Sequence, residues 1–261
     1  MAPADPPDEC LVVDVGGPVA HFRKVGGNST RQTYHAIPRT TVAGLFAAVL
    51  GLGRDTYYDT FGRGVSAVGI VPQTELRTMS LPRSELSTAP KNLSDIGEPF
   101  EDDTGIVTVN PRSLQSRQRN PYEILREVTY RIYLQLDDQQ TYEELAATLE
   151  AGQSVYTPSL GLSECLATVT FRGRHELEQT SNRAVDSVLP DDDSRVRPVA
   201  GVTFLRERVP TFMEAVDSGG RRTTAFTTYT MRQDGGAFDV GDDVPVGTPV
   251  SDELDDRVVF H

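Results

Sequence analysis

Acidic residues are missing from one long stretch of this otherwise acidic chain. The 261 residues include 38 aspartates and glutamates against 25 lysines and arginines, which gives a formal net charge of −13 at pH 7. No acid occurs between Asp14 and Asp55, whereas Arg23, Lys24 and Arg31 fall inside this window. Most of the surface should therefore repel polyanions, and the acid-free stretch is where a phosphate backbone could still bind.

Lysine is also scarce, because Lys24 and Lys91 are the only lysines among the 25 basic residues. Together with acidic runs such as Asp191–Asp193, this bias indicates a protein from a salt-loving cell, where the screening length falls to about 3 Å. We interpret the surplus acid as adaptation to such a solvent, in preference to a metal site or an acidic tail. Arginine suits RNA binding in salt because it adds bidentate hydrogen bonds to its charge, although the same bias is general in such proteomes.

The chain has few features of a secreted, membrane or metal-binding protein. Its two cysteines, Cys10 and Cys165, lack Cys-x-x-Cys spacing and are expected to be reduced and buried. The longest apolar-rich run, residues 42–53, is too short to span a bilayer, and the first residues do not resemble a signal peptide. We expect a cytoplasmic protein, and the absence of nucleotide, zincin and hydrolase motifs predicts no cofactor and no metal.

Strand and helix patterns alternate along the first two thirds of the chain, and the helices carry clear end signals. Strands are predicted at 10–15, 65–72, 127–136 and 165–171, and helices at 38–51 and 141–151. Gly16-Gly17-Pro18 is expected to end the first strand, and Thr141 with Glu144 is expected to form a capping box. The order is that of the α+β, ferredoxin-like and RNA-recognition folds, βαββαβ.

Two regions fall outside this βαββαβ series. Residues 74–122 are polar and rich in proline and serine, and they are predicted to be a long inserted β-hairpin within a core domain of residues 1–172. Residues 173–261 are predicted to be a β-rich extension packed on the core, with strand-like pieces near 197–205 and 223–231 and an acidic tail.

The strand at 127–136 alternates strictly, so that one face is apolar and the other polar. The apolar face is predicted to carry Val128, Tyr130, Ile132, Leu134 and Leu136. Tyr133 is the only aromatic residue of the polar face, which gives little support for stacking of bases on the sheet.

Two motifs resemble a known family. The segment Gly16–Lys24, followed by the helix Pro38–Gly51, resembles the N-terminal signature of the Cas-five family of CRISPR-associated RAMP proteins in its type I-B form. The segment Tyr156–Cys165 resembles the Pro-x-Leu-Gly turn of the same family. The resemblance covers about the first 170 residues and is weak over the C-terminal third.

This resemblance implies a ferredoxin-like core with a long inserted hairpin, called the thumb. It also implies a position at one end of the multisubunit Cascade complex in antiviral defence. There the protein would hold the 5′ handle of the CRISPR RNA (crRNA) and contact the backbone subunit and the large subunit. Most type I members are non-catalytic caps, whereas type I-C members cut the precursor RNA.

Candidate RNA contacts lie in three acid-free stretches. The first holds a basic loop and the start of the helix at 38–51, where free backbone N–H groups attract phosphate: His21, Arg23, Lys24, Asn28, Arg31, Arg39, Thr40, Thr41 and Gly44. The second, residues 104–122, holds Arg112, Arg117 and Arg119, and the third, residues 218–233, holds Arg221 and Arg222 after two glycines. An ordinary surface loop, a helix cap, a disordered polar segment and a hairpin turn remain alternative interpretations of these features.

The alternative function is a metal-independent endoribonuclease that processes precursor crRNA. His21, Lys24, Tyr34 and His35 include the residue types for such chemistry. However, the resemblance implies that type I-C enzymes carry adjacent Lys and His residues in the thumb. In this chain the only lysine of the thumb region, Lys91, is followed by Asn92. We therefore expect no enzymatic activity. A third possibility, a halophilic metabolic enzyme of α+β fold, has no motif to support it.

Overall fold

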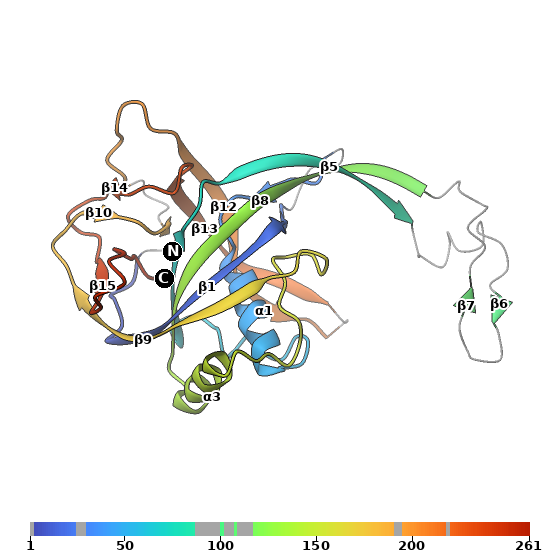
Figure 1. Ribbon diagram of the computed structural model, residues 1–261, viewed down its shortest axis with the longest axis horizontal. Helices are drawn as coiled ribbons and strands as arrows, with labels where there is room; N and C mark the ends of the chain where they lie inside the picture. Colours follow the sequence, from blue (N-terminus) through green and yellow to red (C-terminus); the bar gives the residue numbers. More distant parts are fainter. Residues whose placement is uncertain are drawn as a thin grey trace.

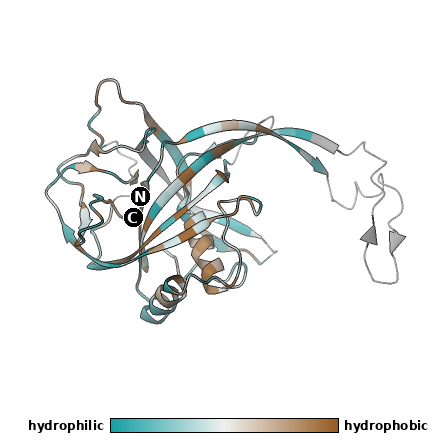
Figure 2. Cartoon of the chain, in the orientation of Figure 1, coloured by the Kyte–Doolittle hydropathy of each residue, from teal (hydrophilic) through white to brown (hydrophobic). Residues whose placement is uncertain are grey.

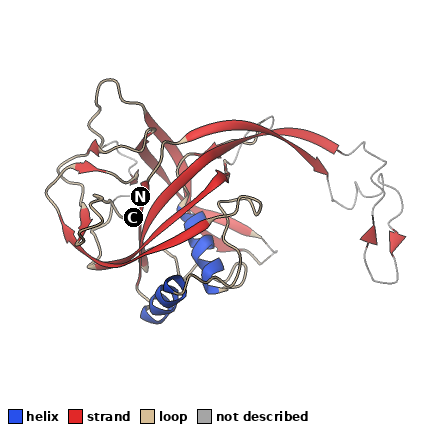
Figure 3. Cartoon of the chain, viewed as in Figure 1, coloured by secondary structure: helices blue, strands red, loops and turns tan. Residues whose placement is uncertain are grey.

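A computed structural model of the protein describes residues 3–24, 30–86, 100–101, 107–108, 117–190, 195–217 and 220–261. Its main antiparallel sheet has the strand order β15-β9-β1-β8-β4. The strands are β1 (Glu9–Ala20), β4 (Ser66–Pro72), β8 (Arg117–Leu136), β9 (Thr168–Gln179) and β15 (Gly247–Pro249). Within the described residues there are two helices, α1 (Arg39–Leu50) and α3 (Gln139–Glu150), and they lie on the same side of the sheet (Figures 1 and 3).

The mixed class with antiparallel sheets is confirmed, and the elements follow one another in the predicted order β1, α1, β4, β8, α3, β9. Helix α1 begins after Pro38 and ends at Gly51, which adopts the left-handed conformation with φ 73°. These are the proline and glycine signals on which the prediction depended.

Three local predictions were wrong, the first being the strand-like piece near 197–205, because the strand there begins only at Phe204. Strand β1 does not end at Gly16-Gly17-Pro18 but continues to Ala20. The reason is close packing, since a Cβ on Gly16 would lie 2.5 Å from the Thr129 hydroxyl on the neighbouring strand. Helix α3 is capped by Asp138, whose carboxylate accepts hydrogen bonds from the Gln140 N–H and the Thr141 hydroxyl, so that Thr141 does not act as the cap.

The hydrophobic core fills the space between the helices and one face of the sheet. All five residues of the predicted apolar face of β8 are at most 2% exposed, namely Val128, Tyr130, Ile132, Leu134 and Leu136. Helix α1 is apolar on most sides (Figure 2), because it is enclosed by the sheet, by α3 and by β12 (Phe204–Ala215). A helix buried on several sides needs no polar stripe.

Part of the opposite face of the sheet is covered by residues 254–260. Leu254, Val258 and Phe260 pack against Val12 and Tyr133 in a second buried cluster. Tyr133 is therefore completely buried, and its hydroxyl donates to Asp256 at 2.6 Å. This placement removes Tyr133 from any base-stacking surface.

The last third of the chain adds a small sheet of order β11-β13-β12, in which β11 is Leu189–Pro190 and β13 is Arg221–Arg232. Two further strands, β10 (Ala184–Val185) and β14 (Phe238–Asp239), pair with each other. Val209, Tyr229 and Met231 from this sheet belong to the main hydrophobic core. The division into domains at residue 172 stays a prediction.

The predicted insertion contains a long two-stranded ribbon. Strand β5 (Arg77–Leu86) pairs antiparallel with the first half of β8, from Arg77 opposite Arg126 to Leu86 opposite Arg117. Figure 1 shows this ribbon projecting away from the sheet and helices. The short pairs β2 (Phe22–Arg23) with β3 (Thr33–Tyr34) and β6 (Phe100–Glu101) with β7 (Val107–Thr108) complete the described strands.

In the described part of the chain, no helix has the length and apolar character needed to cross a membrane.

His261 is expected to make stability depend on pH. Its main chain pairs with Val68, and its ring is buried beside the Tyr229 hydroxyl, 2.6 Å from Nε2. Burial, and secondarily the Arg39 charge, lower the pKa of His261 well below its ordinary value. Below about pH 6.5 the unfolded chain therefore binds a proton that the folded chain does not, and folding loses about 1.4 kcal/mol per pH unit.

Chemical denaturation between about pH 7 and pH 5.5 measures this slope. We expect the free energy of unfolding to fall less steeply with decreasing pH in His261→Gln than in the wild type. His175→Gln, which also removes one imidazole, is the control. Equal slopes in the wild type and His261→Gln would contradict the prediction.

Candidate functional site

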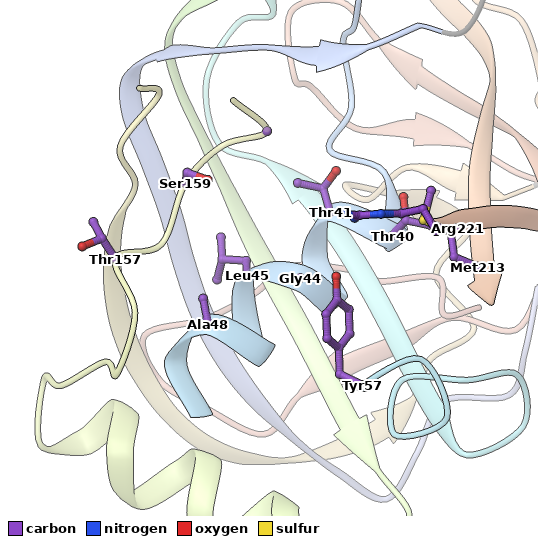
Figure 4. A pocket seen from close by; sticks show the side chains of 11 residues that line it. Thr40, Thr41, Gly44, Leu45, Ala48, Tyr57, Thr157, Ser159, Met213 and Arg221 are labelled. Carbon is purple, nitrogen blue, oxygen red and sulfur yellow. The ribbon is translucent and has the colours of Figure 1, made fainter. Parts of the chain in front are cut away.

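A cavity of about 280 Å³ opens beside the first half of α1, and we call it the α1 cavity. Thr40, Thr41 and Gly44 of α1 form one wall, and Thr157 and Ser159 form another (Figure 4). Tyr57, Met213 and Arg221 also line it. The cavity thus brings together the helix motif, the Pro-x-Leu-Gly turn and the third acid-free stretch, which are far apart in the sequence.

The start of α1 lies at this cavity and has no capping side chain. Pro38 precedes the helix without a side-chain cap, and the first turn contains no acidic residue. The main-chain N–H groups of Thr41 and Val42 both donate to the Pro38 carbonyl. The positive end of the helix dipole is therefore not neutralised by a carboxylate within the helix, which favours an anion nearby.

Glycines allow two close approaches at the cavity wall. A Cβ on Gly44 would lie 3.2 Å from the Tyr57 hydroxyl, so the bare helix backbone makes room for the tyrosine. Gly161 has φ 94°, and a Cβ there would collide with the His21 carbonyl. The His21 N–H also donates to the Leu160 carbonyl at 3.0 Å, which fixes the Pro-x-Leu-Gly turn against the end of β1.

The two adjacent arginines at the start of β13 have different surroundings. The Arg221 side chain lines the α1 cavity and is 39% exposed, and its Nε lies 3.6 Å from the Asp55 carboxylate. Arg222 does not line the cavity, and its Nε donates to Glu214 at 2.9 Å on the same hairpin. Only one of these two guanidinium groups therefore faces the cavity.

The chemistry of the α1 cavity suits a phosphate-bearing ligand. Among the described residues that line it, hydroxyl groups are numerous, one guanidinium is present and no side chain is acidic. Hydroxyls, guanidinium groups and helix N-termini are the usual partners of phosphate oxygens. Within the described residues, no group of three or more His, Cys, Asp or Glu side chains could hold a metal ion.

Lys24 does not extend freely from the basic loop. Its ammonium donates to Glu207 of β12 at 2.6 Å, and the same carboxylate accepts from the His35 N–H at 2.7 Å and contacts His35 Nδ1 at 3.0 Å. Burial raises the pKa of Glu207, but the hydrogen bonds from His35 and Lys24 outweigh burial and hold it below its ordinary value. Glu207 therefore neutralises part of the predicted cationic loop.

His21 and Arg39 are buried, and their placement does not support a role as RNA contacts. The His21 ring is 1% exposed, with Nδ1 2.8 Å from the Glu123 carbonyl, and burial lowers its pKa. The Arg39 guanidinium donates to the Ser66 carbonyl at 2.9 Å and to the His261 carbonyl. Both side chains serve the interior of the protein, which a pattern of basic residues could not indicate.

The other predicted contacts are dispersed. Arg23 and Arg119 are exposed, and Arg31 is half-buried with its main chain paired to Pro121 and Glu123 of β8. Asn28 and Arg112 lie outside the described residues, as does the side chain of Arg117. RNA contact by these residues stays a prediction, whereas the pairing of Arg222 with Glu214 makes Arg222 a weaker candidate than Arg221.

Tyr57 and Met213 of the cavity wall were not predicted as site residues. Tyr57 lies in the turn after α1, and no motif marks it. Met213 reaches the cavity from β12, and its place depends on how the C-terminal hairpin packs against α1. Thr157 and Ser159 were within a recognised motif but were not assigned a role.

Comparisons with known proteins find one matching family model and several solved structures of similar fold. Residues 10–226 match the family model described as CRISPR-associated protein (Cas_Cas5). A chain of a "CRISPR RNA-guided surveillance complex" aligns with a TM-score of 0.51 and 16% identity, covering 92% of this chain and 91% of that one. A CRISPR protein from Archaeoglobus fulgidus aligns with a TM-score of 0.50 and 14% identity, covering 96% and 98%. A search of curated proteins finds no match.

At these identities the two structures show a shared fold, and the match to the family model carries the assignment. The model extends over residues 10–226 and so includes the α1 cavity with its wall residues from Thr40 to Arg221. The protein belongs to the Cas_Cas5 family of CRISPR-associated proteins.

Proposed function

We propose that the protein is a non-catalytic, RNA-binding subunit of a type I CRISPR interference complex. In this role it binds the 5′ handle of the crRNA, caps one end of the Cascade assembly and contacts the backbone and large subunits. Membership of a CRISPR-associated family supports a place in a CRISPR complex. The observation that carries RNA binding is the α1 cavity, which has a helix N-terminus, several hydroxyls and Arg221 but no acidic lining residue among those described.

The contrast with the rest of the molecule strengthens this proposal. The chain carries a formal net charge of −13, so an RNA strand is repelled by most of its surface. A wall without carboxylates allows the phosphate to approach, and Arg221 can donate two parallel hydrogen bonds to it. The volume of about 280 Å³ is at the lower limit of small-molecule clefts and suits one nucleotide unit of a longer strand.

We also propose the finer description of the fold. The order β9-β1-β8-β4 places the first and third strands of the βαββαβ series at the centre of an antiparallel sheet. This order supports a ferredoxin-like core. The projecting ribbon of β5 and the first half of β8 is then the thumb, which would contact neighbouring subunits of the complex.

A non-catalytic role agrees with the surroundings of the groups that could have acted on RNA. His21 is buried and held by the Glu123 carbonyl, and Lys24 is paired with Glu207. Neither side chain is free to serve as a base or as a cation beside a 2′-hydroxyl. Lys24, Tyr34 and His35 do lie close together, with the Lys24 ammonium 5.5 Å from the Tyr34 ring centroid. However, Tyr34 is buried, and Glu207 engages both Lys24 and His35, which does not favour the alternative, an endoribonuclease.

The type I-B assignment depends on the sequence motifs, and the halophilic, cytoplasmic setting depends on composition. In molar salt, charge alone binds RNA weakly. A cavity that adds hydroxyl and bidentate guanidinium hydrogen bonds loses less affinity under those conditions. The proposed site therefore suits the proposed solvent.

Removing Arg221 should release bound RNA, whereas removing Arg222 should not. Both Arg221→Ala and Arg222→Ala remove one positive charge, but only Arg221 lines the α1 cavity. Losing one charge-assisted hydrogen bond of about 1.5–3 kcal/mol weakens binding by about tenfold or more. The measurement is the amount of RNA that copurifies with the natively expressed protein and the uniformity of its 5′ end. Equal RNA in the two variants, or none with the wild type, would refute the proposal.

Filling the α1 cavity should have the same effect without a change of charge. Gly44→Leu places a side chain in the cavity, and the Tyr57 hydroxyl, 3.2 Å from the new Cβ, is the end of a side chain that can move. We expect the fold to persist and RNA retention to fall about tenfold. Ala147→Leu places the same leucine side chain on the exposed side of α3 and should retain RNA. Normal RNA retention by a folded Gly44→Leu variant would place the RNA elsewhere.

A further inference from the structure

Asp55, which ends the acid-free stretch, lies at the rim of the α1 cavity next to Arg221. It has φ 65° and is one of two described residues other than glycine with a positive φ. The left-handed conformation is unfavourable for most side chains but is tolerated by Asp and Asn. The turn after α1 thus holds a carboxylate in an uncommon backbone conformation beside a site that we propose for a polyanion.

Three side chains fix the Asp55 carboxylate. The Tyr58 hydroxyl donates to Oδ1 at 2.6 Å, Arg54 Nε lies 3.3 Å from Oδ2, and Arg221 Nε lies 3.6 Å from Oδ1. The side chain is only 23% exposed. The hydrogen bond from Tyr58, followed by the nearby arginines, lowers the pKa of Asp55, so the carboxylate stays charged at neutral pH.

The contact with Arg221 is made through Nε, at the side of the guanidinium group. Among the described residues, Asp55 is the acidic residue that forms an ion pair with Arg221. Figure 4 shows the Arg221 side chain directed from β13 toward Thr40 and Thr41 at the start of α1. A guanidinium held by Nε presents its terminal N–H groups as a fork, which is the geometry that binds two phosphate oxygens.

Two described charged residues close to Arg221 and Asp55 in the sequence, Arg222 and Asp59, do not form an ion pair with each other beside the α1 cavity. Arg222 is held by Glu214 within its own hairpin, and Asp59, four residues after Asp55, is exposed without an ion pair to a described residue. A carboxylate near a bound phosphate repels it, so Asp55 has a clear cost for RNA binding unless it orients Arg221.

We propose that Asp55 is a positioning residue for RNA, which holds Arg221 by Nε so that the fork of the guanidinium faces the α1 cavity. Tyr58 supports the carboxylate from the other side. This inference rests on the proposed function, because it assigns a role within the same site.

The direction in which RNA affinity changes when the Asp55 charge is removed tests this role. Asp55→Asn deletes a negative charge, and Asn tolerates the positive φ, so the fold should remain. If Asp55 only adds charge, the variant binds RNA more tightly. If Asp55 positions Arg221, the variant binds about five- to tenfold more weakly, a coupling usual for charged groups in contact.

The experiment measures fluorescence anisotropy of a labelled short oligouridylate with full-length protein at several potassium chloride concentrations. Asp59→Asn is the matched control and should bind as tightly as the wild type or more tightly. In the Arg221→Ala background, Asp55→Asn should cause no further loss. Tyr58→Phe should weaken binding in the same direction as Asp55→Asn but less, and circular dichroism melts establish that each variant is folded.

Two results separate this inference from the proposed function. If Arg221→Ala weakens binding but folded Asp55→Asn binds as tightly as the wild type or more tightly, the positioning role is wrong and the site stands. A loss in Asp55→Asn that persists in full without Arg221 also overturns the role. If the wild type does not bind, or Arg221→Ala binds equally well, both proposals fall.

Discussion

The arrangement of the site depends on one buried cation at the start of α1. The Arg39 guanidinium donates to the Ser66 carbonyl and hydroxyl at 2.9 and 2.7 Å and to the His261 carbonyl, and it lies 5.0 Å from the Phe212 ring centroid. It thus joins the first turn of α1 to β4, to the end of the chain and to β12. Burial lowers the pKa of Arg39 to about 10, so the group remains charged at neutral pH. Because these contacts set α1 against the C-terminal hairpin, they bring Thr40, Thr41 and Arg221 to one cavity.

Carboxylates in this protein restrict where positive charge remains accessible. Glu207 binds Lys24 and contacts His35, and Glu214 holds Arg222, so that much of the charge noticed in the sequence is neutralised within the fold. Asp55 approaches Arg221 at Nε, with 3.6 Å between Nε and Oδ1. The result is a strongly anionic protein in which the α1 cavity retains an accessible guanidinium beside a helix N-terminus. Position, more than the number of basic residues, distinguishes this region.

Local patterns predicted the helices and most strands because each signal and its consequence lie within a few residues. Pro38 and Gly51 bound α1, and the alternation in β8 identified its buried face. Gly16 led to a wrong prediction of the end of β1, because glycine occurs both in turns and where two strands pack closely. Only the register of β1 with β8 decides between these two roles. Gly44, Thr40, Thr41 and Arg221 were named from the sequence, but their meeting in one cavity depends on tertiary packing. The burial of His21 and Arg39 likewise depends on partners 102 and 222 residues away.

The most direct test of a ligand site between α1 and β13 is ultraviolet cross-linking of the natively copurified RNA, followed by mass spectrometry of the peptides. Cross-linking reports contact without changing any residue. The account predicts nucleotide adducts on the peptides that contain Tyr57 and Met213, which line the cavity. Adducts confined to the open sheet surface around Gly16, Thr129 and Thr168 would contradict it, because those residues line a separate groove.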